Sequence, residues 1–324
     1  MIATGKAPKI AKRPPGGNNE RYHLFLIAIP FLILVIVFNY GPILGWLISF
    51  FNYTPRPNQL VTWNDWNNFN SFKLIVGNEI QRAEILRVLR NTAAISLLNL
   101  ATSILPVAFA IFLAEIRVGW YKKTVQVLTT LPNFISWVLV YSFAFALFSI
   151  DSGAVNSVLV KLGVITQDQK INFLADPDTG WTIWLQMTAW GIWKGLGWGA
   201  IMYLAAIAGI DQELYEAARV DGAGRFRMMW SITLPGVMET FFVLLLLSIA
   251  NFVNNGMEQY FMFQNAMNKS HIEVLDLYVY NVTFNSISNI SMTTAISMLK
   301  SLISVSLLMI ANQLSKLVRG NTII

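Results

Sequence analysis

The chain has 324 residues, of which 55% are hydrophobic and 12% are charged, whereas an average soluble domain carries about 25% charged residues. This balance argues against a soluble globular enzyme and against a disordered chain, which would be polar and highly charged. There is no cysteine and there are two histidines, so thiolate chemistry is excluded and no metal site is expected. The net charge of +6 is interpreted here as a bias across a membrane, and no nucleic-acid partner is expected.

Six segments are apolar over about the 20 residues that a membrane-spanning helix needs. They cover 24–51, 91–113, 125–148, 181–210, 236–252 and 292–314. The first apolar stretch is too long for a cleavable signal peptide and has no small-x-small cleavage site after it, so we predict an uncleaved anchor. Pro30 and Pro42 within it predict a kink.

The predicted spans divide the chain into a membrane core and flanking segments. Residues 1–22 form a basic, disordered tail, 23–52 the anchor helix, 53–90 an external loop, 91–314 the core with five spans, and 315–324 a second tail. Lysine and arginine are more frequent on the side that holds both tails. The positive-inside rule therefore predicts a bacterial inner-membrane protein with both termini in the cytoplasm. The aromatic-rich external segments either receive an external protein or pack on one another.

The segment 211–235 between the fourth and fifth spans contains a short amphipathic helix with small residues on its apolar face. We predict that it runs from about Asp211 to Val220 and breaks at Gly222 and Gly224. Its polar face carries both signs of charge, which favours a protein groove over an anionic lipid surface.

This segment resembles the EAA loop of permease subunits in binding-protein-dependent ABC importers. The sequence EAARVDGAGRFRMMWSITLP has the pattern E-A-A, three residues, Gly, nine residues, I-x-L-P. Met229 and Trp230 depart partly from the aromatic pair that often precedes the last element. The stretches LPNFISWVLVYSF, GWGAIMYLAAIAGID, EQYFMF and DLYVYN resemble oligosaccharide permeases of the lipoprotein-associated branch, with a looser similarity to permeases for acidic polysaccharides such as alginate.

The resemblance implies an all-α integral membrane protein, a MetI-like type I importer permease with six transmembrane helices and a cytoplasmic coupling helix. It implies a second homologous permease as heterodimer partner, two ATPase subunits, an external solute-binding protein, a saccharide substrate and surrounding lipid. The residues implied in ATPase coupling are Glu216, Ala217, Ala218, Asp221, Gly222, Ala223, Ile232, Leu234 and Pro235. The chain lacks a G-x-x-x-x-G-K-[ST] loop, so ATP and Mg would be bound by the partner ATPase. We expect no cofactor and no catalytic residue in this chain.

Polar side chains within the spans predict a substrate pathway, because they are costly in lipid and tend to face a cavity or another helix. Gln186, Trp190 and Lys194 recur every four residues and share one helix face. The full predicted set is Asn133, Trp137, Gln186, Trp190, Lys194, Asn251, Asn254, Glu258 and Lys300. For any one of these residues, packing between helices is the alternative.

Lys194 has no acid within its own span and Lys300 has no neighbouring acid, and two unpaired cations in the membrane favour an anionic saccharide such as a uronate oligosaccharide. Alternatively, both lysines bond backbone carbonyls or an acid of the partner chain.

Two other classes of membrane protein are alternatives for a chain with six spans that contain polar side chains. A secondary transporter or channel works without ATP, and a membrane enzyme needs clustered catalytic side chains, which the sequence does not show. ATP-dependent uptake in the presence of the partner subunits separates the importer from both.

Overall fold

The structure, a computed structural model, describes residues 18–53, 63–174, 180–285 and 290–319. The predictions for residues 1–17, 54–62 and 320–324 therefore lie outside it. Within the described ranges the fold is all helical, apart from one bridge between Phe51 and Trp66. Five helical segments there are long and apolar enough to cross a membrane, and a bent pair of helices supplies a sixth. The predicted all-α membrane fold is confirmed.

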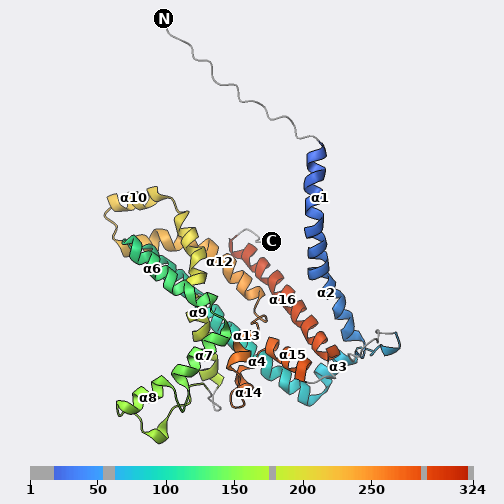
Figure 1. Cartoon of the computed structure of the whole chain (residues 1–324). Helices are drawn as coiled ribbons and strands as arrows, with labels where there is room; N and C mark the ends of the chain where they lie inside the picture. Colours follow the sequence, from blue (N-terminus) through green and yellow to red (C-terminus); the bar gives the residue numbers. More distant parts are fainter. Residues whose placement is uncertain (1–17, 54–62, 175–179, 286–289, 320–324) are drawn as a thin grey trace.

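The first span stands apart from the rest of the molecule (Figure 1). It consists of α1 (Asn18–Val35), a π-helical turn (Ile36–Tyr40), α2 (Gly41–Leu44) and a 3₁₀ turn (Gly45–Phe50). At the place of the predicted kink the helix type changes, because the π-helical turn ends at Tyr40, two residues before Pro42. Proline has no backbone N–H, and a π turn accommodates this missing donor. Among the described residues the span is fastened to the bundle at its far end, where Ser291 Oγ donates to Phe51 O at 2.6 Å.

The second span begins earlier than predicted. After α3 (Asn70–Gly77), α4 (Glu79–Thr102) and α5 (Ile104–Ala114) form one continuous span of 36 residues. The helix starts at Glu79 rather than near 91 because the Asn78 side chain caps it, accepting from the backbone N–H of Ile80 at 3.0 Å.

The third span is bent, and the prediction of one continuous helix over 125–148 is wrong. The helix α6 (Gly119–Thr130) continues into a 3₁₀ turn (Leu131–Phe134), and α7 (Trp137–Phe148) leaves it at 103°. Pro132 removes one N–H from the helical ladder, and the Ser136 hydroxyl then caps a new helix. Both features favour a break at this point.

The rest of the bundle is organised around α9 (Gly180–Ala208), the fourth span. The other helices are α8 (Ala154–Lys161), α10 (Gln212–Val220), α11 (Arg225–Met228), α12 (Leu234–Ala250), α13 (Glu258–Phe263), α14 (Lys269–Ile272), α15 (Leu275–Asn285) and α16 (Ile290–Arg319). One core cluster joins α9 to α4, α7 and α13–α15, and a second joins it to α5 and α12. At Gly197, an added Cβ would lie 2.3 Å from Thr129 O, so α6 and α9 approach backbone to backbone.

The two ends of the molecule differ in the segments they carry. The start of α1, the whole of α10 and the end of α16 lie at one end, and α8 and α14 lie at the other (Figure 1). Aromatic side chains of the segments expected outside pack on one another. Trp66 and Phe69 pack edge to face at 5.8 Å between ring centroids, and so do Phe261 and Tyr280 at 5.4 Å. Mutual packing of these aromatics is therefore observed, and the binding of an external protein stays a prediction.

Candidate functional site

The predicted coupling helix is present as α10, with a defined stop at each end. The Asp211 carboxylate accepts from the N–H of Glu213 at 3.0 Å and caps the first turn. At the other end Ala223 N–H donates to Ala218 O at 2.9 Å, and Gly222 has φ +75°. This is a Schellman ending, in which a left-handed residue is required and glycine is preferred. Of the two predicted break points, Gly222 is therefore the one that ends the helix.

The apolar face of α10 is exposed. Val220 is 88% exposed and Leu214 is 53% exposed, and Glu216 and Ala217 are exposed beside them. A cavity of about 170 Å³ next to the helix end is lined by Ala218, Asp221, Ala223, Arg227, Met228, Ser231 and Ile232. A protein surface with small residues and an apolar ridge suits a groove on another protein.

The helix α10 is fastened to the membrane bundle at two points that the sequence analysis did not single out. Tyr215 Oη lies 2.9 Å from Thr233 Oγ1, and Thr233 is buried. Gly236 fits against Ile210, since an added Cβ would lie 2.5 Å from Ile210 Cδ1. Tyr215 could have been singled out from the sequence because it lies at helical spacing in α10. Its partner Thr233 is identified only by the fold.

The last three predicted coupling residues lie in the fifth span itself. A continuous helix over Arg225–Ala250 contains a π-helical turn at Met229–Thr233 directly before Leu234 and Pro235. The fifth span therefore begins near 225 and not at 236. Ile232 contributes to the cavity beside α10, whereas Pro235 is exposed.

In the pathway set, Lys194 meets the break in the third span. Its ammonium donates to the carbonyl oxygens of Asn133 at 2.7 Å, Ile135 at 2.8 Å and Pro132 at 3.2 Å. It also lies 5.5 Å from the ring centroid of Trp137. Three of the predicted residues thus meet at one point, and the Lys194 alternative of backbone carbonyls is the one observed.

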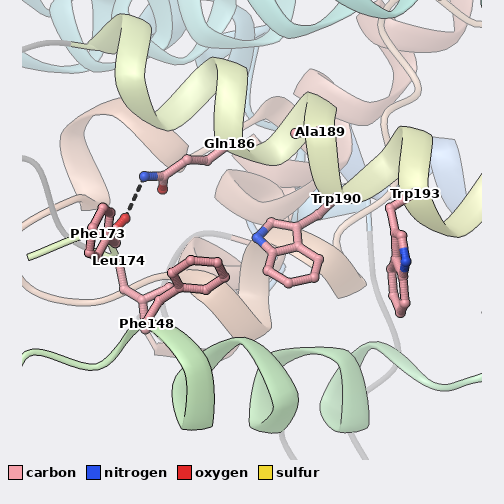
Figure 2. Close-up of a pocket in the computed structure, with 7 residues that line it drawn as sticks. All are labelled: Phe148, Phe173, Leu174, Gln186, Ala189, Trp190 and Trp193. Carbon is pink, nitrogen blue, oxygen red and sulfur yellow. Dashed lines mark hydrogen bonds between the residues drawn. The ribbon is translucent and has the colours of Figure 1, made fainter. Parts of the chain in front are cut away.

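Gln186 and Trp190 line an aromatic cavity of about 350 Å³ (Figure 2). Its other walls are Phe148, Phe173, Leu174, Ala189 and Trp193. Gln186 reaches across the cavity and its amide nitrogen donates to Phe173 O. The Trp190 ring packs edge to face with Trp193 at 5.7 Å. Aromatic faces suit the apolar faces of sugar rings, and the Gln186 amide suits hydroxyl groups.

The remaining pathway residues follow the end of α12. Asn251, Asn254 and Glu258 are exposed, and Asn254 Nδ2 donates to Ser304 Oγ at 3.0 Å. Exposed amide side chains at the end of a span cost free energy where they contact lipid. They therefore favour a position in contact with water or with another protein.

Lys300 is paired, which corrects the prediction that it has no acidic neighbour. Its ammonium forms an ion pair with the Asp276 carboxylate of α15, and the other oxygen of Asp276 accepts from Gly256 N–H at 2.9 Å. Neither lysine is therefore a free cation, and the charge argument for an anionic saccharide is not supported by Lys194 or Lys300.

Comparison with known proteins gives one family and several relatives. The family described as "Binding-protein-dependent transport system inner membrane component" matches residues 106–320. Protein LplB of Bacillus subtilis (strain 168) is 38% identical over 297 residues, covering 90% of this chain and 88% of LplB. The polygalacturonan/rhamnogalacturonan transport system permease protein YteP of the same organism is 35% identical over 298 residues, covering 92% of this chain and 88% of YteP.

Two solved structures share the fold. One is the crystal structure of a bacterial ABC transporter involved in the import of the acidic polysaccharide alginate. It superposes with a TM-score of 0.80 at 26% identity, covering 93% of this chain and 97% of the other. The second is a bacterial alginate ABC transporter in complex with an alginate pentasaccharide-bound periplasmic protein. It superposes with a TM-score of 0.81 at 26% identity, covering 94% and 98%.

Proposed function

The chain belongs to the family of binding-protein-dependent transport system inner membrane components, and from this premise we propose what it moves and how it is driven. It is a permease subunit of an ABC importer that takes a saccharide from a solute-binding protein and passes it into the cytoplasm. The observation that carries this function is α10, a capped helix with an exposed apolar face at one end of the membrane bundle. Alternating access follows when the partner ATPase subunits move such helices together.

The substrate class is an acidic oligo- or polysaccharide. YteP is named for polygalacturonan and rhamnogalacturonan transport and is 35% identical to this chain, and the two solved transporters carry alginate. All three polymers contain uronates. The aromatic cavity of Gln186 and Trp190 gives the sugar rings a surface to stack on, and the exposed Asn251, Asn254 and Glu258 offer polar contacts further along.

The coupling residues follow from the position of α10. Glu216, Ala217 and Ala218 face a groove of the ATPase, Asp221, Gly222 and Ala223 form the turn that ends the helix, and Ile232, Leu234 and Pro235 connect it to the fifth span. The end of the molecule that carries α10, the start of α1 and the end of α16 is then cytoplasmic. ATP and Mg are bound by the ATPase.

Reconstituted transport tests this function. The chain is purified with its second permease, ATPase and solute-binding protein, and uptake of a labelled oligogalacturonate and a neutral oligosaccharide of equal length is measured in proteoliposomes. ATP inside the compartment that holds the ATPase should drive uptake, with the acidic sugar preferred. Uptake driven by a proton or sodium gradient without ATP would instead identify a secondary transporter.

A further inference from the structure

The break in the third span leaves backbone carbonyls without helical partners. Ile135 and Ser136 are extended. Among the described residues the carbonyls of Asn133 and Ile135 therefore have no backbone donor, whereas the Pro132 carbonyl accepts from Ile135 N–H at 3.2 Å. A backbone carbonyl that lacks a partner costs several kcal/mol in a membrane, because no water replaces the lost bond. Some donor must reach this point from another element.

Lys194 is that donor. An ammonium has three N–H groups and no acceptor, and Lys194 directs hydrogen bonds to three carbonyls, those of Pro132, Asn133 and Ile135. A cation also suits this place, because the C-terminal end of a helix carries partial negative charge. The lysine is therefore occupied by the protein itself.

The position of Lys194 on α9 joins the break to the coupling helix. One turn further along, Gly197 brings the α9 backbone against Thr129 of α6. From Lys194 the helix runs without interruption to Ala208, about 21 Å at 1.5 Å per residue, and α10 begins four residues later. A single uninterrupted helix thus connects the start of the coupling segment with the bend and with Trp137 at the start of α7.

We propose that Lys194 is a positioning residue that fastens the bend of the third span to α9, so that the pathway wall beginning at Trp137 follows the coupling helix. It is not the cation that binds the saccharide carboxylate. This inference rests on the proposed transport function, and its test includes a measurement that does not depend on transport.

Two substitutions separate the roles. Lys194→Met shortens the side chain by one atom and removes every donor, whereas Lys194→Gln replaces the ammonium by an amide with two donors and removes the charge. Lys170→Met is the matched control, since Lys170 lies between the predicted third and fourth spans and donates to the single carbonyl of Asp151 at 3.1 Å. All are assayed in the full complex for uptake of acidic and neutral oligosaccharides and for ATPase stimulation by the loaded binding protein.

We expect Lys194→Met to lower uptake of both sugars about tenfold or more, because charge-assisted bonds to the bend are lost, with ATP hydrolysis no longer stimulated by the loaded binding protein. Lys194→Gln should stay within about threefold of the wild type, and Lys170→Met should be unchanged. Equal losses in both Lys194 variants that affect only the acidic sugar would overturn the inference and make Lys194 a substrate cation. Wild-type behaviour of Lys194→Met would also overturn it.

A distance measurement decides the inference independently. Because the chain has no cysteine, spin labels attach only at Ser142→Cys in α7 and Met202→Cys in α9. The distance distribution between them should broaden in Lys194→Met and stay narrow in Lys194→Gln. An unchanged distribution in Lys194→Met would show that Lys194 does not hold the bend, and it would do so even if the complex moved no saccharide. If Lys194→Met does not assemble, Lys194→Gln decides the inference, because uptake of both sugars within about threefold of the wild type supports a positioning role and loss of the acidic sugar alone contradicts it.

Discussion

At the scale of single residues, the two intramembrane lysines show how a charge is accommodated in a membrane. Lys194 is held by carbonyls of another span, and Lys300 by the Asp276 carboxylate. In both cases groups of the same chain accept the hydrogen bonds of the lysine ammonium. The proposed preference for an acidic saccharide is therefore assigned to other groups or to the solute-binding protein.

The Lys300–Asp276 pair leads to a stability prediction. Lys300→Met leaves a largely buried carboxylate without its cation and should lower the free energy of unfolding by about 3 kcal/mol. The double variant Lys300→Met, Asp276→Asn removes both charges and should recover most of this loss. Thermal unfolding of the purified complex measures both. If uptake by the double variant loses its preference for acidic over neutral sugar, Lys300 contacts substrate after all.

At the scale of elements, the contact between α6 and α9 depends on one glycine. Gly197→Ala places a methyl group 2.3 Å from the Thr129 carbonyl oxygen, and backbone cannot yield as a side chain can. We expect the helices to separate, with a cost of about 1–3 kcal/mol and loss of the Lys194 hydrogen bonds nearby. Gly191→Ala in the same helix is the control, because nothing lies within 4 Å of its added Cβ. Equal melting temperatures of the two variants would contradict this packing.

The coupling helix gives a second prediction at this scale. Gly222 has φ +75°, where a residue with a side chain costs about 1–2 kcal/mol, and Gly222→Trp also adds bulk beside the exposed face of α10. Both Gly222→Trp and Glu216→Lys should abolish stimulated ATP hydrolysis or weaken binding of the ATPase, while the spans still insert. Gly163→Trp is the matched control, since Gly163 also has a positive φ, of +71°, but lies beyond α8 at the other end of the molecule. Normal stimulation in both coupling variants would refute the role of α10.

At the scale of the whole molecule, the sequence predicts the features that depend on neighbouring residues, such as spans and helix ends. It does not predict contacts between residues far apart in the chain. Hydrophobic length predicted the number of spans, and the small-residue helix that stops at glycine predicted α10. The bend at Pro132 was missed because the apolar residues on both sides of the break have together the length of one span. The Asp276 partner of Lys300 was missed because it lies outside the predicted sixth span. The partners of Lys194 are backbone carbonyls, which no side-chain pattern records.

The last prediction concerns assembly. The chain carries one coupling helix, and its polar Asn251, Asn254 and Glu258 lie exposed near the end of α12, where a facing protein wall costs less than lipid. In the proposed importer two ATPase subunits act on two such helices, so we expect a second permease to supply the other helix and the facing wall. We expect this permease to be a different chain with its own coupling segment, giving one copy of each. A tagged form of this protein is purified after co-expression with the neighbouring transporter genes, and the mass of the intact complex is measured. Two tags of different mass on this chain test the homodimer directly, since recovery of both tags in one complex with no other permease would refute the heteromer.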